Sequence, residues 1–403
     1  MSPRSLAKGI GLLSDEERAA VEEVLASHTL FRYDAPIEAS RVHAFELGLQ
    51  DRLGVGRAIA VSSGTAALRV ALAALGVGCG AEVVVPAFTF IATVNAVVTA
   101  GAVPIFCEVD DTLTMDPRDL AAKITPRTAA IMPVHLENVA ADMDAILPAA
   151  GDIAVIEDSA QAIGVTYKGR AAGTIGAIGA FSLQAQKNIT AGEGGAVVTN
   201  DDALGLRAAR YQDQGGQFIT QHGGSRGGEL GEPFVGENLR MTEIAGAIAT
   251  IQLGRLDGLI ANLRANATAI AALVGDIDGL TPRRVPDAAG AIGSSLTWFA
   301  PSSELAKQFV KALRAERVPS AQMYEGLPVY AAPAILAKRT ATGKGGPWNC
   351  AEHPTDASYA IGMCPQTEDL VARSITVGIG PGFDSADCDD VAAAITKVAG
   401  DLL

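Results

Sequence analysis

Short apolar runs alternate with helical segments through the first half of the chain, and this alternation limits the possible folds more than any other feature. The runs predict strands at residues 58–61, 82–85, 103–106, 129–133, 154–157, 180–183 and 194–199, with helices at 65–75 and 90–100. Strands that alternate with helices at this spacing predict a mostly parallel sheet, covered on both faces, in an α/β fold. Such sheets bind ligands at the carboxyl ends of their strands, so functional residues are expected directly after strands.

Both ends of the chain add helices, and the second half predicts a separate α/β unit. A capping box at residues 14–17 begins a helix that continues to Ser27. Further elements are expected as helices at 37–53, 241–274, 303–317 and 387–401 and a strand at 296–300. We therefore expect a large domain at residues 1–250, whose N-terminal helices pack toward the small domain, and a smaller C-terminal α/β domain at residues 251–403.

Between Gln214 and Gly236 the alternation fails. The segment is polar and rich in glycine, so it cannot build a core. Loops of this length are usually functional or disordered, and we expect a functional loop here.

The charge of the chain limits its partners. With 45 acidic and 31 basic residues the net charge is −14, so neither nucleic acid nor an anionic membrane is expected to attract the chain. Residues 83–107 carry no charge and resemble a membrane span, but Pro86 and Pro104 interrupt them, which favours strand, helix and strand. The first thirty residues are charged and amphipathic rather than a secretory signal, so a cytoplasmic location is expected.

The cysteines predict neither a metal site nor a disulfide framework. Their number is odd and no two have CxxC spacing, so all are expected to be reduced, buried thiols. They are Cys79, Cys107, Cys350, Cys364 and Cys388.

Three polar positions follow predicted strands. Asp158 ends the run Ala154-Val-Ile-Glu-Asp, where it could cap a helix or face a ligand such as a protonated pyridine nitrogen. Lys187 lies between a strand and a glycine-rich turn, where it could be a solvated charge or a desolvated amine that attacks an aldehyde. Gly64 and Thr65 begin a helix, whose free amides could bind phosphate or could form an ordinary cap.

Together with longer matching stretches, these positions resemble the DegT/DnrJ/EryC1/StrS family of sugar and cyclitol aminotransferases, which have the fold-type I of pyridoxal-phosphate enzymes. The stretches that carry the resemblance are SSGTAALRVALAALGVG, VPAFTFIATVNAV, GAVPIFCEVD, EDSAQAIG, FSLQAQKNITAGEGGAVVTND and GENLRMTE. The resemblance implies a large domain with a mostly parallel, seven-stranded sheet. It also implies pyridoxal 5'-phosphate as the cofactor.

The resemblance also implies residue roles. Lys187 would form a Schiff base with the cofactor and move protons, while Asp158 would keep the pyridine nitrogen protonated. Gln161 would contact the phenolic oxygen, and Phe88 would either stack on the ring or pack in the core. The phosphate would be held by Gly64, Thr65 and Ser182 together with Asn238 of a partner subunit.

A cofactor site that includes Asn238 of a partner implies a homodimer with shared active sites, framed by the loop at 214–236. Arg240 is a candidate for anchoring a carboxylate or lining the shared site. Tyr324 and Tyr330 resemble substrate-side residues, although simple packing remains an alternative for both.

One segment departs from the family pattern. The family often has His-Leu-Tyr-Gly where this chain has His135-Leu-Glu137-Asn138, so the substrate contacts there are open. His135 is a candidate catalytic residue, but a hydrogen-bonded role in the core is an equal alternative.

The expected reaction is transfer of an amino group from L-glutamate or L-glutamine to a keto or aldehyde sugar or cyclitol. The NITAGEGG turn resembles branches that act on cyclitols, aminohydroxybenzoate precursors or octulosonate sugars. Dehydratases of the family have histidine in place of the lysine, so Lys187 argues against them, whereas elimination or decarboxylation by a lysine-retaining relative stays open. A non-catalytic regulator is expected to lose Lys187 or Asp158. No nicotinamide motif G-x-G-x-x-G follows the first strand, and the chain has no P-loop.

Overall fold

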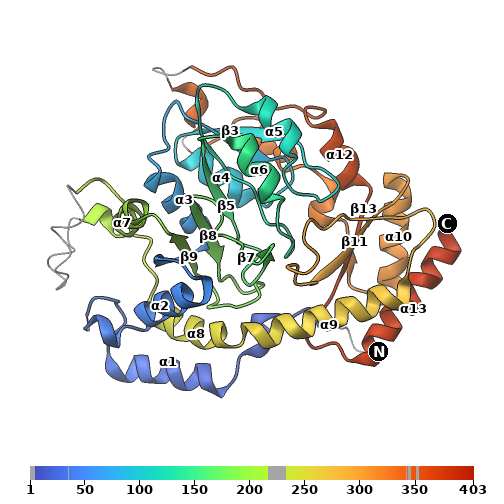
Figure 1. The fold of residues 1–403 in the computed structure, drawn as a ribbon, viewed down its shortest axis with the longest axis horizontal. Coiled ribbons are helices and arrows are strands. Elements are labelled where there is room, and N and C mark those ends of the chain that lie inside the picture. Colours follow the sequence, from blue (N-terminus) through green and yellow to red (C-terminus); the bar gives the residue numbers. More distant parts are fainter. Residues whose placement is uncertain (1–4, 35, 217–232, 342, 344–345, 351–353) are drawn as a thin grey trace.

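The computed structural model describes residues 5–34, 36–216, 233–341, 343, 346–350 and 354–403. A seven-stranded sheet has the order β1-β9-β8-β5-β4-β2-β3 (Figure 1). Its strands are β1 Arg57–Val61, β2 Glu82–Pro86, β3 Val103–Cys107, β4 Thr128–Ile131, β5 Ala154–Asp158, β8 Ile178–Ser182 and β9 Gly195–Thr199. Strands β8, β5, β4, β2 and β3 pair in parallel, whereas β9 is antiparallel to both β8 and β1. The predicted mostly parallel α/β sheet is confirmed, with strand ends shifted by at most two residues.

The apolar sequence of these strands reflects burial of the sheet on both faces. In β1, Ala58 and Ala60 pack with one set of buried residues, whereas Ile59 and Val61 pack with another set that includes helix α3. Because neighbouring strand residues point to opposite faces, each face needs its own apolar layer. The helices of this part are α1 Asp15–Ser27, α2 Arg41–Leu53, α3 Gly64–Ala74, α4 Ile91–Thr99, α5 Pro117–Lys123, α6 Met143–Ala150 and α7 Asp202–Tyr211.

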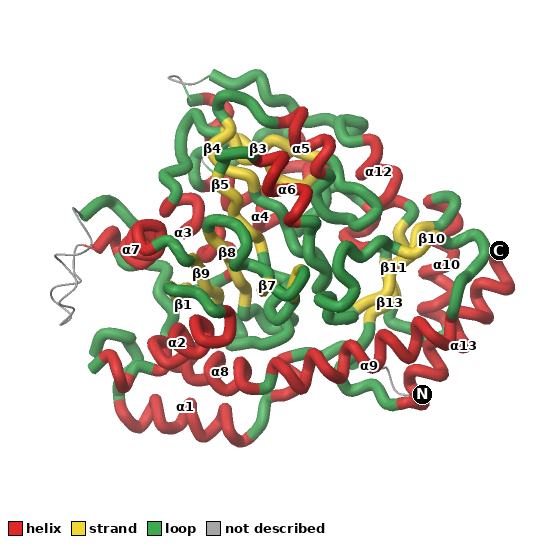
Figure 2. Tube along the Cα trace, in the orientation of Figure 1, coloured by secondary structure: helices red, strands yellow, loops and turns green. Residues whose placement is uncertain are grey.

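A four-stranded antiparallel sheet of order β10-β11-β13-β12 forms the second unit (Figure 2). Its strands are β10 Thr281–Pro282, β11 Ser295–Phe299, β12 Ser320–Ala321 and β13 Ser374–Gly378, and a hairpin of β6 Thr166–Tyr167 and β7 Arg170–Ala171 stands apart from both sheets. The remaining helices are α8 Glu243–Gly254, α9 Leu256–Val274, α10 Ser303–Ala315, α11 Pro333–Leu336, α12 Pro365–Ala372 and α13 Ser385–Leu402. The predicted strand at 296–300 and the closing helix are present.

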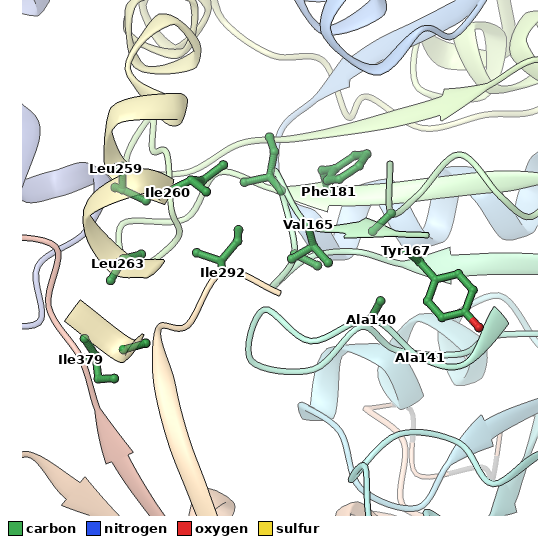
Figure 3. Packing of buried hydrophobic residues seen from close by; sticks show 14 of the residues in the cluster. Ala140, Ala141, Val165, Tyr167, Phe181, Leu259, Ile260, Leu263, Ile292 and Ile379 are labelled. Carbon is green, nitrogen blue, oxygen red and sulfur yellow. The ribbon is translucent and has the colours of Figure 1, made fainter. Parts of the chain in front are cut away.

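Helix α9 joins the two units through one continuous apolar core. In Figure 3, Leu259, Ile260 and Leu263 of α9 lie among Val165 and Phe181 on one side and Ile379 on the other. Helices α1 and α2 both pack against α8, and the expected domain boundary after residue 250 falls inside α8. The division into domains at that residue stays a prediction.

Three local expectations need correction or comment. The helix expected at 37–53 begins later, because the Ser40 hydroxyl accepts a hydrogen bond from the His43 amide (3.1 Å) and caps α2 after a short 3-10 turn. The uncharged stretch 83–107 forms β2, α4 and β3 as expected. The loop at 214–236 lies largely outside the described residues.

The expectation of five reduced cysteines is wrong for two of them. Cys79 and Cys350 form a disulfide across 271 residues of sequence, whereas Cys107, Cys364 and Cys388 are buried free thiols. Because the fold brings the two cysteines together, spacing along the chain gave no signal.

Within the described residues, no single helix is long and apolar enough to cross a membrane. The pair α8 and α9 passes that test together but is bent by 51°. The same part of the chain holds no cluster of three or more histidine, cysteine or acidic residues that could bind a metal ion.

Candidate active site

A cavity of about 1080 Å³ lies where the carboxyl ends of the large-sheet strands face the small sheet. Asp158 ends β5, Ser182 ends β8, and Gly64 begins α3 directly after β1. Small-sheet residues such as Ser295 and Thr376 line the opposite wall. The cavity therefore lies at the place that the strand pattern predicted.

The N-terminus of α3 forms one end of the cavity. The Ser63 hydroxyl accepts a hydrogen bond from the Ala66 amide (3.0 Å) and caps the helix, so the amides of Gly64 and Thr65 lie at its open first turn. A side chain at Gly64 would place its Cβ 2.6 Å from Cβ of Ser182. Only glycine lets the helix start come this close to the Ser182 hydroxyl, and Gly64, Thr65 and Ser182 form a small cradle with the geometry that suits an anion.

Asp158 is a buried carboxylate that faces the cavity. Its Oδ2 accepts a hydrogen bond from the Thr93 hydroxyl (2.8 Å), and its Oδ1 accepts one from the Ala160 amide (3.2 Å). Burial raises the pKa of Asp158, and these two hydrogen bonds and the charge of Lys187 counter the rise only in part. The carboxylate therefore lacks a strong cationic partner of its own.

Lys187 lies in the turn after β8. Its amide donates to the Gln184 carbonyl (2.9 Å), and its carbonyl accepts from the Gly9 amide (3.2 Å), so the turn is fixed at both ends. Burial lowers the pKa of Lys187, and the positive charge of Lys8 lowers it further, while Asp158 and Glu137 oppose both effects. The lowered pKa increases the fraction of free amine, which is the nucleophilic form.

The aromatic residue at the cavity differs from the one expected. Phe88 is only 1% exposed, packs edge-on against Tyr324 (5.4 Å between ring centroids) and does not line the cavity. Phe90 does line it and is 54% exposed. The structure therefore places Phe88 in the core, which is the alternative that the sequence left open, and it places Phe90 at the cavity.

Gln161 and Tyr324 meet at the cavity. The Gln161 side-chain amide donates to the Tyr324 hydroxyl (3.0 Å), and its oxygen accepts from the Glu137 amide (3.2 Å). Tyr324 has a left-handed backbone (φ 46°), as does the next residue, Glu325 (φ 59°), which turns its chain segment toward the cavity. The structure thus brings Tyr324 to the expected place.

Tyr330, in contrast, lies in the core. It is fully buried, packs against Phe106 (5.3 Å between centroids) and donates a hydrogen bond to Glu368. The packing alternative holds for Tyr330, because its hydroxyl is already satisfied away from the cavity.

His135 is also enclosed and does not line the cavity. The Ala141 amide donates to Nδ1 (3.0 Å), so Nε2 carries the proton and donates to the Glu157 carboxylate (2.8 Å). Glu157 also accepts from the Gly173 amide (2.8 Å). Because both ring nitrogens of His135 are hydrogen-bonded inside the core, the core role fits His135 and a catalytic role does not.

Asn238 and Arg240 lie outside the cavity of their own chain. Asn238 is exposed next to Asp213, and Arg240 forms an ion pair with Asp213 and lies over the Phe31 ring (5.1 Å to its centroid). Neither residue is therefore placed against Lys187 of the same chain.

The cavity also contains residues that the sequence did not single out, namely Lys8, Phe90, Thr93 and Glu193. Thr93 could have been identified from the sequence by its spacing, because it follows Thr89 by four residues. In the structure the two hydroxyl groups are 2.7 Å apart. The position of Lys8 depends on how the N-terminal segment folds back, which no local pattern reveals. Glu137 was noted only as a departure from the family pattern.

The backbone conformation explains why this chain can have Asn138 where the family often has glycine. Asn138 takes the place of the family's glycine and has φ 60°, a left-handed conformation that asparagine tolerates better than most residues. Its side chain donates to Ser294 (2.8 Å) and accepts from Asn188 (2.7 Å), which binds the turn to the small sheet. Asparagine therefore keeps the turn and adds hydrogen bonds that glycine could not make.

The residues present fit pyridoxal phosphate. The cradle of Gly64, Thr65 and Ser182 suits a phosphate, and the buried carboxylate of Asp158 suits a protonated ring nitrogen. The amine of Lys187 lies in the same cavity with a lowered pKa, as attack on an aldehyde requires.

A two-sheet α/β fold with a phosphate-sized cradle, a buried acid and a lysine amine in one cavity fits the class of pyridoxal-phosphate enzymes. The comparison with known sequences narrows this class. The sequence model of the DegT/DnrJ/EryC1/StrS aminotransferase family matches residues 12–396, and the chain belongs to this family.

Individual relatives agree with this assignment. An L-glutamine:2-deoxy-scyllo-inosose aminotransferase of Streptomyces fradiae is 34% identical over 404 residues, which cover 94% of this chain and 91% of the relative. GDP-perosamine synthase of Caulobacter vibrioides is 45% identical over 216 residues, which cover 53% of this chain and only 56% of that relative. A crystal structure of 3-amino-5-hydroxybenzoic acid synthase has a TM-score of 0.82 at 29% identity, with all of both chains covered.

Proposed function

We propose that this enzyme is a pyridoxal-phosphate-dependent aminotransferase that moves an amino group from L-glutamine or L-glutamate to a keto or aldehyde group on a sugar or cyclitol. The observation that carries the proposal is the placement of the Lys187 amine and the buried Asp158 carboxylate in one cavity with a phosphate cradle. The relatives named above support a hydroxylated ring as the acceptor.

Each of these residues has a defined task. When bound, pyridoxal phosphate supplies an electron sink that acidifies the substrate carbon next to the nitrogen. Lys187 Nζ would take a proton from that carbon and deliver it to the cofactor, a task that suits an amine whose pKa is lowered. Asp158 keeps the ring nitrogen protonated, and Gln161 holds Tyr324 at the substrate side.

The cavity wall supports a polyhydroxylated acceptor. The lining of the small sheet and of the turns that face it includes residues with neutral hydroxyl or amide groups, which are Asn138, Asn188, Ser294, Ser295, Ser320 and Thr376. Such groups can both donate and accept hydrogen bonds, and ring hydroxyls need both.

The proposed active form is a homodimer. Asn238 is exposed and does not line the cavity of its own chain, which supports a role in the partner's site. Mass measurement in solution tests the dimer, and Asn238→Ala is expected to weaken cofactor binding without changing the fold of its own subunit.

The deciding experiment is an absorbance spectrum of the protein with pyridoxal phosphate, before and after addition of L-glutamine or L-glutamate. We expect a visible band that either donor bleaches, and no such band in Lys187→Ala. Lys168→Ala, at an exposed lysine that pairs with Asp144, is the control and should keep the band. A band that neither donor changes would point to different chemistry on the same cofactor. Absence of the band in the wild type would refute the proposal.

A further inference from the structure

The N-terminal segment forms part of the cavity wall. Leu6, Ala7, Lys8 and Ile10 all line the cavity, although α1 begins only at Asp15. The segment is held on both sides of Lys8. The Gly9 amide donates to the Lys187 carbonyl (3.2 Å), and a Cβ on Gly9 would lie 2.8 Å from Cα of Ile189. This contact fixes Lys8 next to the turn that carries Lys187.

The other side of Lys8 is fixed by the small sheet. A Cβ on Gly378, at the end of β13, would lie 2.7 Å from the Leu6 side chain. Lys8 is therefore placed by contacts with both units of the fold, and its side chain has a defined direction into the cavity.

The ammonium group of Lys8 has no carboxylate partner in the structure. Lys8 forms no ion pair with any acid in the described part of the chain, and the acid whose charge acts on it is Glu137, which lines the same cavity. Burial lowers the pKa of Lys8 more than the charge of Glu137 raises it. A partly buried cation that lacks a partner is costly, and an anion that enters the cavity would remove that cost.

The other cations near the site are already engaged. Arg240 pairs with Asp213, and Arg283 is buried while it donates to the carbonyls of Thr112 (2.6 Å) and Leu136 (3.2 Å). Among the described residues that line the cavity, the cationic side chains are Lys8 and Lys187. Lys187 is committed to the reaction, so Lys8 is the cation that this chain itself supplies to bind an anionic substrate group.

The chemistry of the proposed function supplies this anion. An α-amino acid donor carries its carboxylate on the same carbon as the nitrogen that reacts at Lys187, so the carboxylate must lie within a few ångströms of that lysine. We infer that Lys8 binds the α-carboxylate of the amino donor and so positions the donor beside Lys187. This inference rests on the proposed function.

The test measures the donor half-reaction without an acceptor, as the absorbance change of the protein loaded with pyridoxal phosphate. Lys8→Met keeps the apolar stem and removes the charge. We expect the half-saturating concentration of L-glutamine or L-glutamate to rise roughly ten- to a hundred-fold, since this is the usual effect of truncating one partner of an enclosed charge pair. The limiting rate should change much less, and Lys8→Arg should restore most of the affinity.

Two donor analogues without an α-carboxylate distinguish the loss of the Lys8 charge from a disturbed fold of the N-terminal segment. The α-amides L-glutaminamide and L-isoglutamine lack the α-carboxylate, so their binding should be the same in wild type and Lys8→Met. Lys397→Met, at an exposed lysine of α13, should leave both donors unaffected. A misfolded N-terminal segment would weaken acids and amides alike, and that result would overturn the inference.

The remaining outcomes are also distinct. If Lys8→Met saturates with the amino acids as readily as the wild type does, Lys8 does not bind the carboxylate and the inference is wrong, while the proposed function stands. If the wild type shows no donor-dependent change, the proposed function fails and the inference fails with it.

Discussion

The cavity disfavours the charged forms of both Asp158 and Lys187. Burial raises the pKa of the carboxyl group and lowers the pKa of the amine, although each charge favours the other. A catalytic cavity without its cofactor is therefore expected to reduce the stability of the fold, because desolvation exceeds the attraction between the two groups.

This expectation predicts that Asp158→Asn stabilises the cofactor-free protein. A folded pKa above the unfolded value means that stability falls as pH rises from the ordinary pKa of aspartate through the raised one, and stays lower above it. Asparagine can still accept from Ala160 and can donate to Thr93. At pH 7 we expect a gain of about 1 kcal/mol, seen as a melting temperature a few degrees higher.

The pH dependence provides the control. The difference in melting temperature between wild type and Asp158→Asn should shrink toward about pH 4, where the unfolded carboxyl group is half protonated. Donor-dependent bleaching should be lost in the variant at every pH. A variant that melts below the wild type at pH 7 would contradict the account of Asp158.

Residue positions were predictable from sequence where a local motif fixes the backbone, and not elsewhere. Asp158, Gly64, Ser182 and Lys187 follow strands, so their common position at one sheet edge could be inferred. Phe88 and Phe90 belong to the same short stretch, and which of the two faces the cavity depends on the turn between β2 and α4. His135 could not be placed because its partner, Glu157, lies on β5, 22 residues further along the chain.

At the scale of single elements, the start of α3 combines a helix cap with a close backbone approach. Ser63 caps the helix, and the absence of a side chain at Gly64 lets Ser182 approach the first turn. The sequence predicted the starts of six helices to within two residues, namely α1, α3, α4, α8, α10 and α13. It did not predict α5, α6, α7, α11 or α12. The hairpin β6–β7 and the short strands β10 and β12 were not predicted either, because each strand has only two residues and no periodicity can appear.

The close approach predicts that Gly64→Ala damages the cradle. The new methyl would require a shift of the Ser182 backbone or of α3, so we expect cofactor affinity to fall at least about ten-fold and stability to fall by about 1–3 kcal/mol. Titration with pyridoxal phosphate and thermal melting measure the two effects.

Gly258→Ala is the matched control. Gly258 lies in the first turn of α9, and a Cβ there would contact nothing within 4 Å. Alanine is expected to stabilise this helix by roughly 0.5–1 kcal/mol and to leave cofactor affinity unchanged. Equal effects of the two substitutions would show that the Gly64 contact is not specific.

Across the whole molecule, the fold class was predictable because alternating strands and helices allow few arrangements. What remained hidden were contacts between distant segments. Strand β13 lies in the small sheet beside β11, whereas Cys350, earlier in the same half of the chain, is joined to Cys79 of the large unit. Such pairings depend on the complete chain path, which local patterns do not contain.

The disulfide predicts a thiol count. Unfolded in denaturant without a reducing agent, the chain should react with a thiol reagent at three cysteines, Cys107, Cys364 and Cys388; after reduction it should react at five. A Cys350→Ser variant should show four thiols in either condition. Five reactive thiols in the unreduced wild type would mean that the two cysteines are not joined.

The two ends of the chain differ in how closely they approach the cavity. Lys8 borders it, whereas α13 ends at Leu403, which is half exposed at the periphery (Figure 1). An enzyme attached to a solid support through its last residue would keep its cavity wall free to move and to admit substrate. Attachment near the N-terminus would pull on the segment that carries Lys8, the proposed carboxylate-binding residue. An immobilised form of the enzyme should therefore be attached at its carboxyl end.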